Sequence, residues 1–497
     1  MLLLGIDIGT SSVKVAVINA NTRECIGTAQ YPETEAEIIT PHPGWAEQSP
    51  DAWWEQVQLA ILKLNAKRIY EPASIAAIGI AYQMHGLVMV DKDHQPLRNS
   101  IIWCDSRAVE IGEKAFQEIG KEKCLLHLLN SPGNFTASKL AWVKQNEPAL
   151  YEKADKIMLP GDYIAMKLTG SISTSISSLS EGIFWDFRSN SLSEDIFNYY
   201  QFSTSLIPEV QDVFSEHGRL DQKIAASLSL KPGIPVSYKA GDQPNNALSL
   251  NVLEPGEVAA TAGTSGVIYG VTEQLSWDDA SRINSFAHVN YSTDRRRLGV
   301  LLCINGTGIL NKWVKGISGN HIGYAEVNEL ASKVAVGSEG LMVFPFGNGA
   351  ERMLDNRNVH AQIRGIDLNL HNQAHLFRAA QEGIAFSFRY GLDIMRENGM
   401  HPQMIRAGHA NLFQSPVFNY SFVNTLKVPV EIYHNDGSCG AAMGAGIGAG
   451  IYKNAKEAFE GLKPIRTIQP DGSTALEEHY QQWLESLRSQ INDYSNQ

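Results

Sequence analysis

The chain has 497 residues, a length that usually divides into two or three domains because single hydrophobic cores stop growing well below it. Hydrophobic residues make up 43% of the chain and charged residues 19%, a globular balance that excludes disorder for most of its length. The formal net charge of −12 disfavours nucleic acid and anionic lipid as partners, because both repel an acidic surface.

The cysteines and the N-terminus indicate a reducing compartment. The five cysteines are odd in number and far apart, which favours buried thiols over a disulfide framework or a zinc site. Residues 1–5 lack the basic leader of a signal peptide, and no apolar run is long enough to cross a bilayer. We therefore expect a cytosolic protein with no membrane partner.

In chain order, the first elements predict an α/β architecture of mixed sheet direction. A helix over 50–66 is expected because Ser49 can cap it and Pro50 is favoured at the first helical position. The strands around this helix alternate in polarity or are continuously apolar, and they are expected at residues 2–8, 13–19, 25–31 and 74–82.

Further along, an internal repeat predicts two related halves. Residues 108–169 are expected to be mostly helical, and short strands are expected at 236–240 and 257–262. The turn Gly9-Thr10-Ser11-Ser12-Val13 recurs as Gly263-Thr264-Ser265-Gly266-Val267, about half a chain later. Similar turns at the starts of two halves predict duplicated lobes that face each other, here divided as residues 1–246 and 247–497.

The first of these turns has the residue types that bind a phosphate and a metal. Asp7 ends a strand and offers carboxylate oxygens to Mg²⁺, directly or through water. The turn that follows, with Thr10, Ser11 and Ser12, offers hydroxyl and backbone N–H donors to a phosphate. It is not a P-loop, and an ordinary hairpin is the alternative interpretation. Gly263, Thr264 and Ser265 offer the same donors, so two opposed hairpins would clamp a polyphosphate.

A second carboxylate, Asp242, follows a strand and begins an expected helix. Phosphoryl transfer needs positioning, charge neutralisation and one base that accepts the hydroxyl proton, and Asp242 suits the last role. Its alternative role is that of a helix N-cap. His371 and His375 have metal-ligand spacing on an expected helix, but no third ligand lies nearby in the sequence, which disfavours a metal site there.

Two polar segments between these carboxylates suit a polyhydroxyl ligand. Met84 and His85 follow a buried strand, where α/β folds present ligand groups. Trp103 and Arg107 flank Asp105 and combine an aromatic ring, a carboxylate and a guanidinium within five residues. A structural ion pair between Asp105 and Arg107 is the alternative interpretation.

Together these segments resemble the FGGY carbohydrate kinase family over nearly the whole chain. The segments that carry the resemblance keep the family's order and spacing. They are Asp7 to Lys14, Gly44 to Pro50, Gln83 to Gly86, Phe135 to Lys144, Leu159 to Tyr163, Gly241 to Gln243, Gly263 to Gly266, Gly349 to Arg352, Arg378 to Gly383 and the small-residue run after Gly440.

The resemblance implies two ribonuclease H-like, actin-like ATPase domains with the active site in the cleft between them. It implies Asp242 as the base for the sugar's terminal hydroxyl, and Asp7 near Mg²⁺ and the γ-phosphate of ATP, with both carboxylates available to the metal. The sugar pocket would contain Met84, His85, Asp242 and Gln243, and the nucleotide site would contain Thr10, Gly263, Thr264, Gly308 and Gly408.

One departure from the family concerns the nucleotide. The family's adenosine segment usually begins with two glycines, whereas this chain has Gly408 followed by His409. The imidazole would either re-line the nucleoside wall and change nucleotide preference, or be accommodated by a small shift of the loop.

The resemblance implies a small-molecule sugar and a nucleotide as the partners of the chain, and related kinases are often homodimers. Met84-His85-Gly86 implies a ketose, with transfer of the γ-phosphate from ATP to D-xylulose, giving D-xylulose 5-phosphate, as the first expectation. Ribulose, fuculose, gluconate and glycerol are alternatives in the same class. An actin- or chaperone-like ATPase switch is the alternative of a different class, and it has no use for a sugar pocket beside a base.

Overall fold

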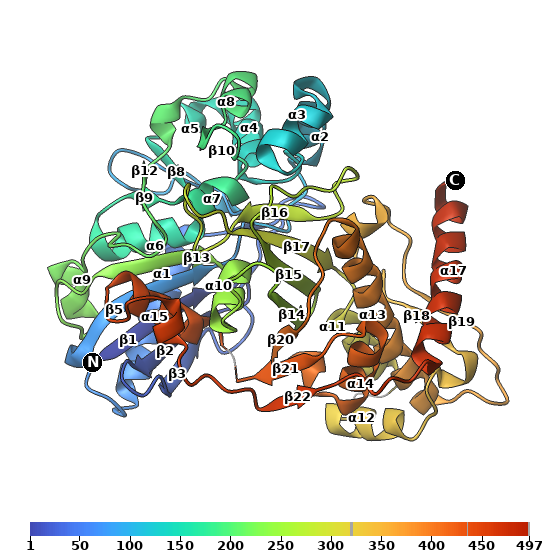
Figure 1. Cartoon of the computed structure of the whole chain (residues 1–497). Coiled ribbons are helices and arrows are strands. Elements are labelled where there is room, and N and C mark those ends of the chain that lie inside the picture. The colour runs from blue at the N-terminus through green and yellow to red at the C-terminus, as the bar shows by residue number, and fades with distance from the viewer. Residues whose placement is uncertain (319–321, 435, 496–497) are drawn as a thin grey trace.

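The computed structural model describes residues 1–318, 322–434 and 436–495, and two mixed β-sheets dominate it (Figure 1). The first sheet has the strand order β13-β5-β1-β2-β3, with β1 paired antiparallel to β2 and parallel to β5. Its strands are β1 (Leu2–Ile8), β2 (Val13–Asn19), β3 (Cys25–Tyr31), β5 (Ile75–Tyr82) and β13 (Val236–Gly241).

The second sheet repeats this arrangement, which confirms the predicted duplication. Its order is β16-β17-β15-β14-β20-β21-β22, and the run β21-β20-β14-β15-β17 has the same strand directions as the first sheet. The strands are β14 (Val258–Ala262), β15 (Gly266–Thr272), β16 (Asn284–Ala287), β17 (Leu298–Ile304), β20 (Ile405–Gly408), β21 (Val430–Tyr433) and β22 (Arg466–Ile468).

Helices cover the sheets and separate them. α1 packs on β2 and β3 of the first sheet, and α13 with α14 and α17 lies on the outer side of the second (Figure 1). The helices attached to the two sheets are α1 (Pro50–Ala66), α6 (Pro160–Thr169), α9 (Gln222–Ser227), α10 (Asp242–Ser249), α11 (Gly308–Ile317), α12 (Tyr324–Ser332), α13 (Gln373–Glu397), α14 (Pro416–Leu426), α15 (Gly437–Gly448), α16 (Ala455–Ala458) and α17 (Ala475–Ser495).

A group of shorter helices is inserted between β5 and β13 and reaches across to β16 of the second sheet. Their buried side chains share one hydrophobic cluster with Phe286 and Ala287 of β16, and the Ser177 hydroxyl donates to the Ala287 carbonyl at 2.8 Å. These helices are α2 (Val109–Ile119), α3 (Lys121–Leu128), α4 (Thr136–Asn146), α5 (Pro148–Tyr151), α7 (Ile176–Glu181) and α8 (Glu194–Tyr200).

The remaining strands are short, and they form two-stranded pairs outside the main sheets. They are β4 (Glu47–Gln48) with β7 (Ser100–Ile101), β6 (Val88–Val90) with β8 (Lys156–Met158), β9 (Ser173–Thr174) with β12 (Glu209–Val210), β10 (Trp185–Asp186) with β11 (Ser191–Leu192), and β18 (Met342–Phe344) with β19 (Gln362–Arg364). In the part of the chain that the structure describes, no helix combines the length and the apolar character that crossing a membrane requires.

Helix α15 links the two halves, and its small residues make this possible. It follows β21 of the second sheet but packs on β1, β2, β5 and β13 of the first. A Cβ at Gly5 would lie 1.8 Å from the Ser438 carbonyl oxygen, and one at Gly79 would lie 2.0 Å from that of Ala441. The helix therefore touches the strand backbones directly, and a Cβ at Gly448 would likewise lie 1.7 Å from the Ser237 carbonyl oxygen, so the small residues of α15 allow this close packing.

Most elements predicted for the core are confirmed. The strands at residues 2–8, 13–19 and 25–31 have the predicted bounds, and α1 begins at Pro50 with the Ser49 hydroxyl accepting from the Ala52 N–H at 3.3 Å. The prediction that the cysteines are buried is wrong for two of them. Cys25 and Cys104 are exposed, because neither lies on a core-facing position of its segment.

Candidate active site

A cavity of about 400 Å³ lies between the two halves, where the ends of β1, β5 and β13 face β15 and β17. Parallel strands present their carboxyl ends at the same edge of a sheet, which gathers segments distant in sequence. The lining residues come from both halves and from the inserted helices. They are Thr10, Met84, His85, Trp103, Asn134, Phe135, Asp242, Gln243, Ser265, Val267, Asn284, Leu301, Cys303, Asn305, Ala350, Arg352 and Asn356.

Asp242 is the first residue of α10 and carries an unusually basic carboxyl. Burial and, after it, the negative charge of Asp7 raise the pKa of Asp242 to about 7, while hydrogen bonds with Gln243 partly offset this. A carboxyl with a pKa near the working pH is suited to accept a proton, because both protonation states are accessible. The helix start alone explains neither the burial nor this shift.

Asp7 lies close to Asp242 and to the first turn of α15. Burial, followed by the charge of Asp436, raises the pKa of Asp7 to about 6, and Lys14 opposes the shift. A Cβ at Gly437 would lie 2.2 Å from the Asp7 carboxylate, which places this side chain against the N-terminus of α15. Within the described residues, neither Asp7 nor Asp242 forms an ion pair, so their negative charge is not balanced in that way.

This charge fits a divalent cation held partly by a substrate. Among the residues that the structure describes, no group of three or more His, Cys, Asp or Glu side chains is arranged to hold a metal alone. Mg²⁺ in kinases typically uses one or two carboxylates together with phosphate oxygens and waters. Asp7 and Asp242 meet that requirement, because a cation between them would relieve the repulsion that raises the pKa of Asp242.

His85 presents one defined nitrogen to the cavity. Burial, followed by the charges of Lys139 and Arg352, lowers the pKa of His85 to about 3, so the ring is neutral. Its Nδ1 lies 3.0 Å from the carbonyl oxygen of Glu181, which can only accept. Nδ1 therefore carries the proton, and Nε2 is left as an acceptor for a ligand hydroxyl.

Two further acceptors in the cavity have no partner among the described residues. The side-chain oxygens of Gln243 and Asn134 are buried and make no hydrogen bond. Asn134 is already fixed by its amide nitrogen, which donates to the Asp105 carbonyl. Unpaired buried acceptors are costly and usually mark the place of a ligand or water. The cavity is therefore prepared for several hydroxyl donors.

The first hairpin is held beside the cavity by a chain of side-chain hydrogen bonds. The Trp103 Nε1–H donates to the Thr10 hydroxyl at 2.9 Å, and this hydroxyl donates to the side-chain amide oxygen of Gln83 at 3.2 Å. The Gly9 N–H donates to the Ser12 carbonyl at 3.1 Å and closes the turn. Thr10 and Trp103 line the cavity, whereas Ser11 and Ser12 do not.

The second hairpin contacts the start of α11. The Gly308 N–H donates to the Gly263 carbonyl at 2.8 Å, and the Ile309 N–H donates to the Thr264 carbonyl at 3.1 Å. A Cβ at Gly308 would lie 2.2 Å from the Gly263 oxygen, so only glycine allows this approach. The predicted nucleotide residues Gly263, Thr264 and Gly308 are thus adjacent, and of this turn Ser265 reaches the cavity.

Arg107 lies outside the cavity, although the sequence predicts it there. Its guanidinium is buried, pairs with Asp105 and Glu47 at 2.7 Å each, and lies 3.8 Å from the centre of the Trp45 ring. All its charge is compensated by these neighbours. This position favours the structural ion pair that the sequence left as an alternative.

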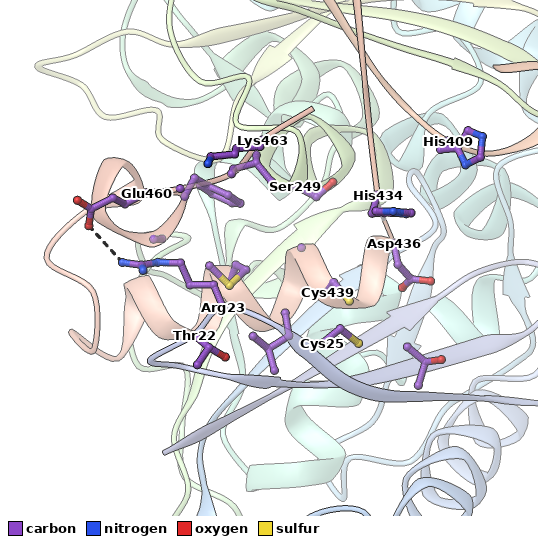
Figure 2. A pocket seen from close by; sticks show the side chains of 18 residues that line it. Thr22, Arg23, Cys25, Ser249, His409, His434, Asp436, Cys439, Glu460 and Lys463 are labelled. Carbon is purple, nitrogen blue, oxygen red and sulfur yellow. Dashed lines mark hydrogen bonds and ion pairs between the residues drawn. The ribbon is translucent and has the colours of Figure 1, made fainter. Parts of the chain in front are cut away.

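Gly408 ends β20 and His409 follows it, and His409 is among the residues that line a different cavity. The His409 N–H donates to the Tyr433 carbonyl at 2.7 Å. Figure 2 shows His409 beside His434 at one end of that second cavity, on the side of α15. From the segment after β20, Asn411 approaches the second hairpin, and its amide nitrogen would lie 3.4 Å from a Cβ at Gly263.

Sequence reasoning missed two charged residues of the site. Glu181 lies beneath His85 and accepts from the Tyr82 hydroxyl at 2.8 Å, and burial raises its pKa well above the usual range. Arg352 lines the cavity over the Phe135 ring at 5.7 Å. Arg352 belongs to a segment of the family resemblance, but Glu181 ends the Ser-rich helix α7, whose sequence has no pattern that indicates a site.

The chain matches the FGGY family of carbohydrate kinases over most of its length. The family's N-terminal domain matches residues 2–249, and its C-terminal domain matches residues 258–449. The chain belongs to the FGGY family of carbohydrate kinases. This confirms the family resemblance and the fold predicted from it, and makes the chain an ATP-dependent sugar kinase.

Several similar proteins align with this chain over almost its whole length. A xylulose kinase from Bacillus subtilis is 28% identical over 466 residues, 92% of this chain and 90% of that protein. Among solved structures, a ligand-bound xylulose kinase from Lactobacillus acidophilus has a TM-score of 0.90 with 19% identity, covering 100% of this chain and 99% of that one. A gluconate kinase from Lactobacillus acidophilus has a TM-score of 0.89, also with 19% identity and coverage of 100% and 99%. These structures share the fold of this chain.

Proposed function

We propose that this FGGY kinase transfers the γ-phosphate of ATP to the terminal hydroxyl of D-xylulose and forms D-xylulose 5-phosphate. The observation that carries the proposal is the set of acceptors around Asp242. Nε2 of His85 and the side-chain oxygens of Gln243 and Asn134 all require hydroxyl donors. A small polyhydroxyl substrate satisfies them, whereas a protein that only hydrolyses ATP has no use for them. The xylulose kinases among its relatives support the choice of sugar.

Asp242 is proposed as the base for the substrate hydroxyl. Its raised pKa, about 7, lets the carboxylate take the proton as the oxygen attacks phosphorus, and the adjacent Gln243 holds the carboxylate in place. Met84 and Trp103 would form the apolar walls, because both line the same cavity. The order of these groups around one cavity favours in-line transfer from a nucleotide held by the two hairpins.

Asp7 and Asp242 are proposed to bind Mg²⁺, which supplies charge neutralisation to the phosphates when bound. The phosphates would contact the N–H and hydroxyl groups of the two hairpins, including Thr10, Ser11 and Ser12 in the first and Gly263, Thr264 and Ser265 in the second. Gly308 and Gly408 would allow close approach of the nucleoside, and His409, which also lines the second cavity, would lie at the edge of that wall.

A sugar acid is a second candidate substrate, and Arg352 is the observation that favours it. The guanidinium lines the cavity, no acidic side chain within ion-pair distance of it is recorded among the described residues, and burial lowers its pKa. A carboxylate on the substrate would compensate this charge. A ketose carbonyl oxygen can accept from the same group, so Arg352 is compatible with both substrates. Its hydrogen bonds to a carboxylate would be stronger than those to a ketone, because both partners would be charged.

A substrate panel tests the proposal directly. Xylulose, ribulose, fuculose, gluconate and glycerol are compared in an assay that couples ADP formation to NADH oxidation. We expect kcat/KM for D-xylulose to exceed that of each other substrate by at least about tenfold. A preference for gluconate that disappears in Arg352→Gln would support the second candidate, and ADP formation independent of any sugar would contradict both. The cytosolic location and a homodimer stay predictions.

A further inference from the structure

A second cavity of the protein is larger than the one at Asp242. About 750 Å³ in volume, it lies along α15 on the side of β2 and β3, and it shares no lining residue with the sugar cavity (Figure 2). Its walls come from the β2–β3 turn, the start of α15, the residues after β20 and β21, and the turn after α16. None of the roles described above uses the side chains on the β3 side of this cavity.

Two cysteines from distant parts of the chain meet in this wall. Cys25 is the first residue of β3 and is exposed, and Cys439 is in the first turn of α15 and is partly buried. Figure 2 shows the two labelled side chains next to each other in the wall of this cavity, and the Cys25 thiol donates to the Gly27 carbonyl of its own strand at 3.7 Å. This placement brings the two sulfurs near to each other, which disulfide formation requires.

The contact also activates one of the two thiols. The neighbouring Cys439 thiol lowers the pKa of Cys25, although burial and Asp436 oppose this shift. Elsewhere burial raises the pKa of Cys104 and raises those of Cys124 and Cys303 to about 12. Cys25 is therefore an accessible thiol with increased thiolate character and with a second thiol beside it, the usual arrangement of an oxidisable pair.

We propose that Cys25 and Cys439 are a redox-active dithiol that a hydroperoxide oxidises to a disulfide. The Cys25 thiolate attacks the distal peroxide oxygen, the O–O bond breaks, and a sulfenic acid and an alcohol (or water) form. The Cys439 sulfur then attacks the Cys25 sulfur, the S–S bond forms, and the S–O bond breaks with release of water. The two thiols supply the two electrons that reduce the peroxide, and their two protons end in the products.

The position of the pair connects it to the active site through backbone. Cys439 lies two residues after Gly437, which abuts the Asp7 carboxylate and whose carbonyl accepts from the Asn245 amide at 2.9 Å. A disulfide would thus link β3, the edge strand of the first sheet, to the turn of α15 that supports Asp7. The cross-link would lie outside the sugar cavity.

Peptide mapping of the whole enzyme tests the proposal. The reduced protein is treated with hydrogen peroxide, remaining thiols are alkylated in denaturant, and peptides are analysed by mass spectrometry without reduction. We expect a peptide pair linked through Cys25 and Cys439, with the free Cys25 thiol lost at least about tenfold faster than that of Cys104. Cys104 is the matched control, because it is also exposed but its pKa is raised.

Two variants separate the steps. In Cys439→Ser the Cys25 sulfenic acid has no resolving thiol, so dimedone should label Cys25 and no cross-link should form. In Cys25→Ser the Cys439 thiol should stay free for as long as Cys104 does. The proposal is overturned if no linked peptide forms in the unmodified enzyme, or if Cys25 and Cys104 are oxidised at the same rate. Both outcomes are independent of which sugar the kinase phosphorylates.

Discussion

Asp7 and Asp242 come from strands more than two hundred residues apart, yet the charge of Asp7 helps to raise the pKa of Asp242 to about 7. Burial makes the larger contribution to this shift. The two carboxylates lie at the ends of β1 and β13, on either side of β5, so the sheet order itself brings them together. This relationship sets both the chemistry of the site and its cost in stability.

Asp242→Asn should abolish most turnover, because the amide has nearly the same shape and cannot accept a proton. We expect kcat to fall by roughly 10²-fold or more while sugar binding, measured by calorimetry, stays within a few-fold of the unmodified enzyme. The matched control is Asp278→Asn, in which an aspartate paired with Arg282 far from the cavity is changed in the same way. Near-normal turnover in Asp242→Asn would show that another group is the base.

The same variant should also make the ligand-free enzyme more stable at alkaline pH. The folded pKa of Asp242, about 7, lies above its ordinary value of 3.8. The stabilising contribution of its neutral form is therefore complete below pH 4 and lost as the pH rises through 7. Relative to the unmodified protein, Asp242→Asn should raise Tm by on the order of 1–2 °C at pH 8 and by less at pH 5. An equal change at both pH values would contradict the assigned shift.

Mg²⁺ binding should weaken as the pH falls, because protons compete for the same carboxylates. The pKa of Asp7 is raised to about 6 and that of Asp242 to about 7, so both must lose protons to bind the cation near pH 6. Calorimetric titration of Mg²⁺ into the enzyme with ADP should show several-fold weaker binding at pH 6 than at pH 8, with proton release. Mg²⁺ binding to free ADP has a pH dependence of its own. The further pH dependence that the enzyme adds should be largely removed in Asp7→Asn. If Asp7→Asn lost sugar binding but bound Mg²⁺ as the unmodified enzyme does, the proposed role of Asp7 as a Mg²⁺ ligand would be contradicted.

His85 should determine which sugar is used. Nε2 can only accept, so His85→Ala removes one partner from a substrate hydroxyl in a buried site and should raise KM for the preferred ketose by roughly tenfold or more. KM for ATP should change little. His217→Ala is the control, because His217 is also buried with its pKa lowered to about 3 but lies elsewhere. Equal losses for every sugar would indicate general damage.

The sequence predicts the parts of this site that follow regular strands, because those positions depend on local patterns. Asp7, His85 and Asp242 each come directly after or at the end of an apolar strand, and the duplicated turn marks the two hairpins. Polarity alternation and turn residues are enough to place such elements. The order of the strands, which brings the three residues together, was predicted only through the family resemblance.

The remaining residues could not be predicted, because their roles depend on contacts between distant segments. Glu181 contacts His85 only because α7, which packs on β13 and β16, is also held at the end of β5 by the Tyr82 hydroxyl. Arg107 is withdrawn from the cavity by Glu47 and Trp45, neither of which is its neighbour in sequence. His409 is similar: its place in the chain is next to the nucleotide segment, but it lines a cavity separate from the one at Asp242. Side-chain direction after a strand end is fixed by tertiary packing.

The last prediction concerns movement of the two halves. The hairpins at Thr10 and Thr264 belong to different sheets, and the halves are joined through α10 and α15, which pack against each other. Both hairpins can hold one polyphosphate only if the cleft narrows, and closing it also excludes water that would compete as acceptor. Small-angle scattering should therefore show a smaller radius of gyration with D-xylulose and a non-hydrolysable ATP analogue together than with either one.

Asp242→Asn provides the control for this movement, because it should bind both ligands and close without turning over. Xylitol keeps the hydroxyl groups but lacks the ketone, so we expect partial closure and some ATP hydrolysis by water. Closure in the variant would separate the movement from the chemistry, since the lobes would then respond to ligand contacts alone. An unchanged scattering profile under saturating ligands, in enzyme that still turns over, would mean that the ligand-free cleft is already closed and that the hairpins do not act as a clamp.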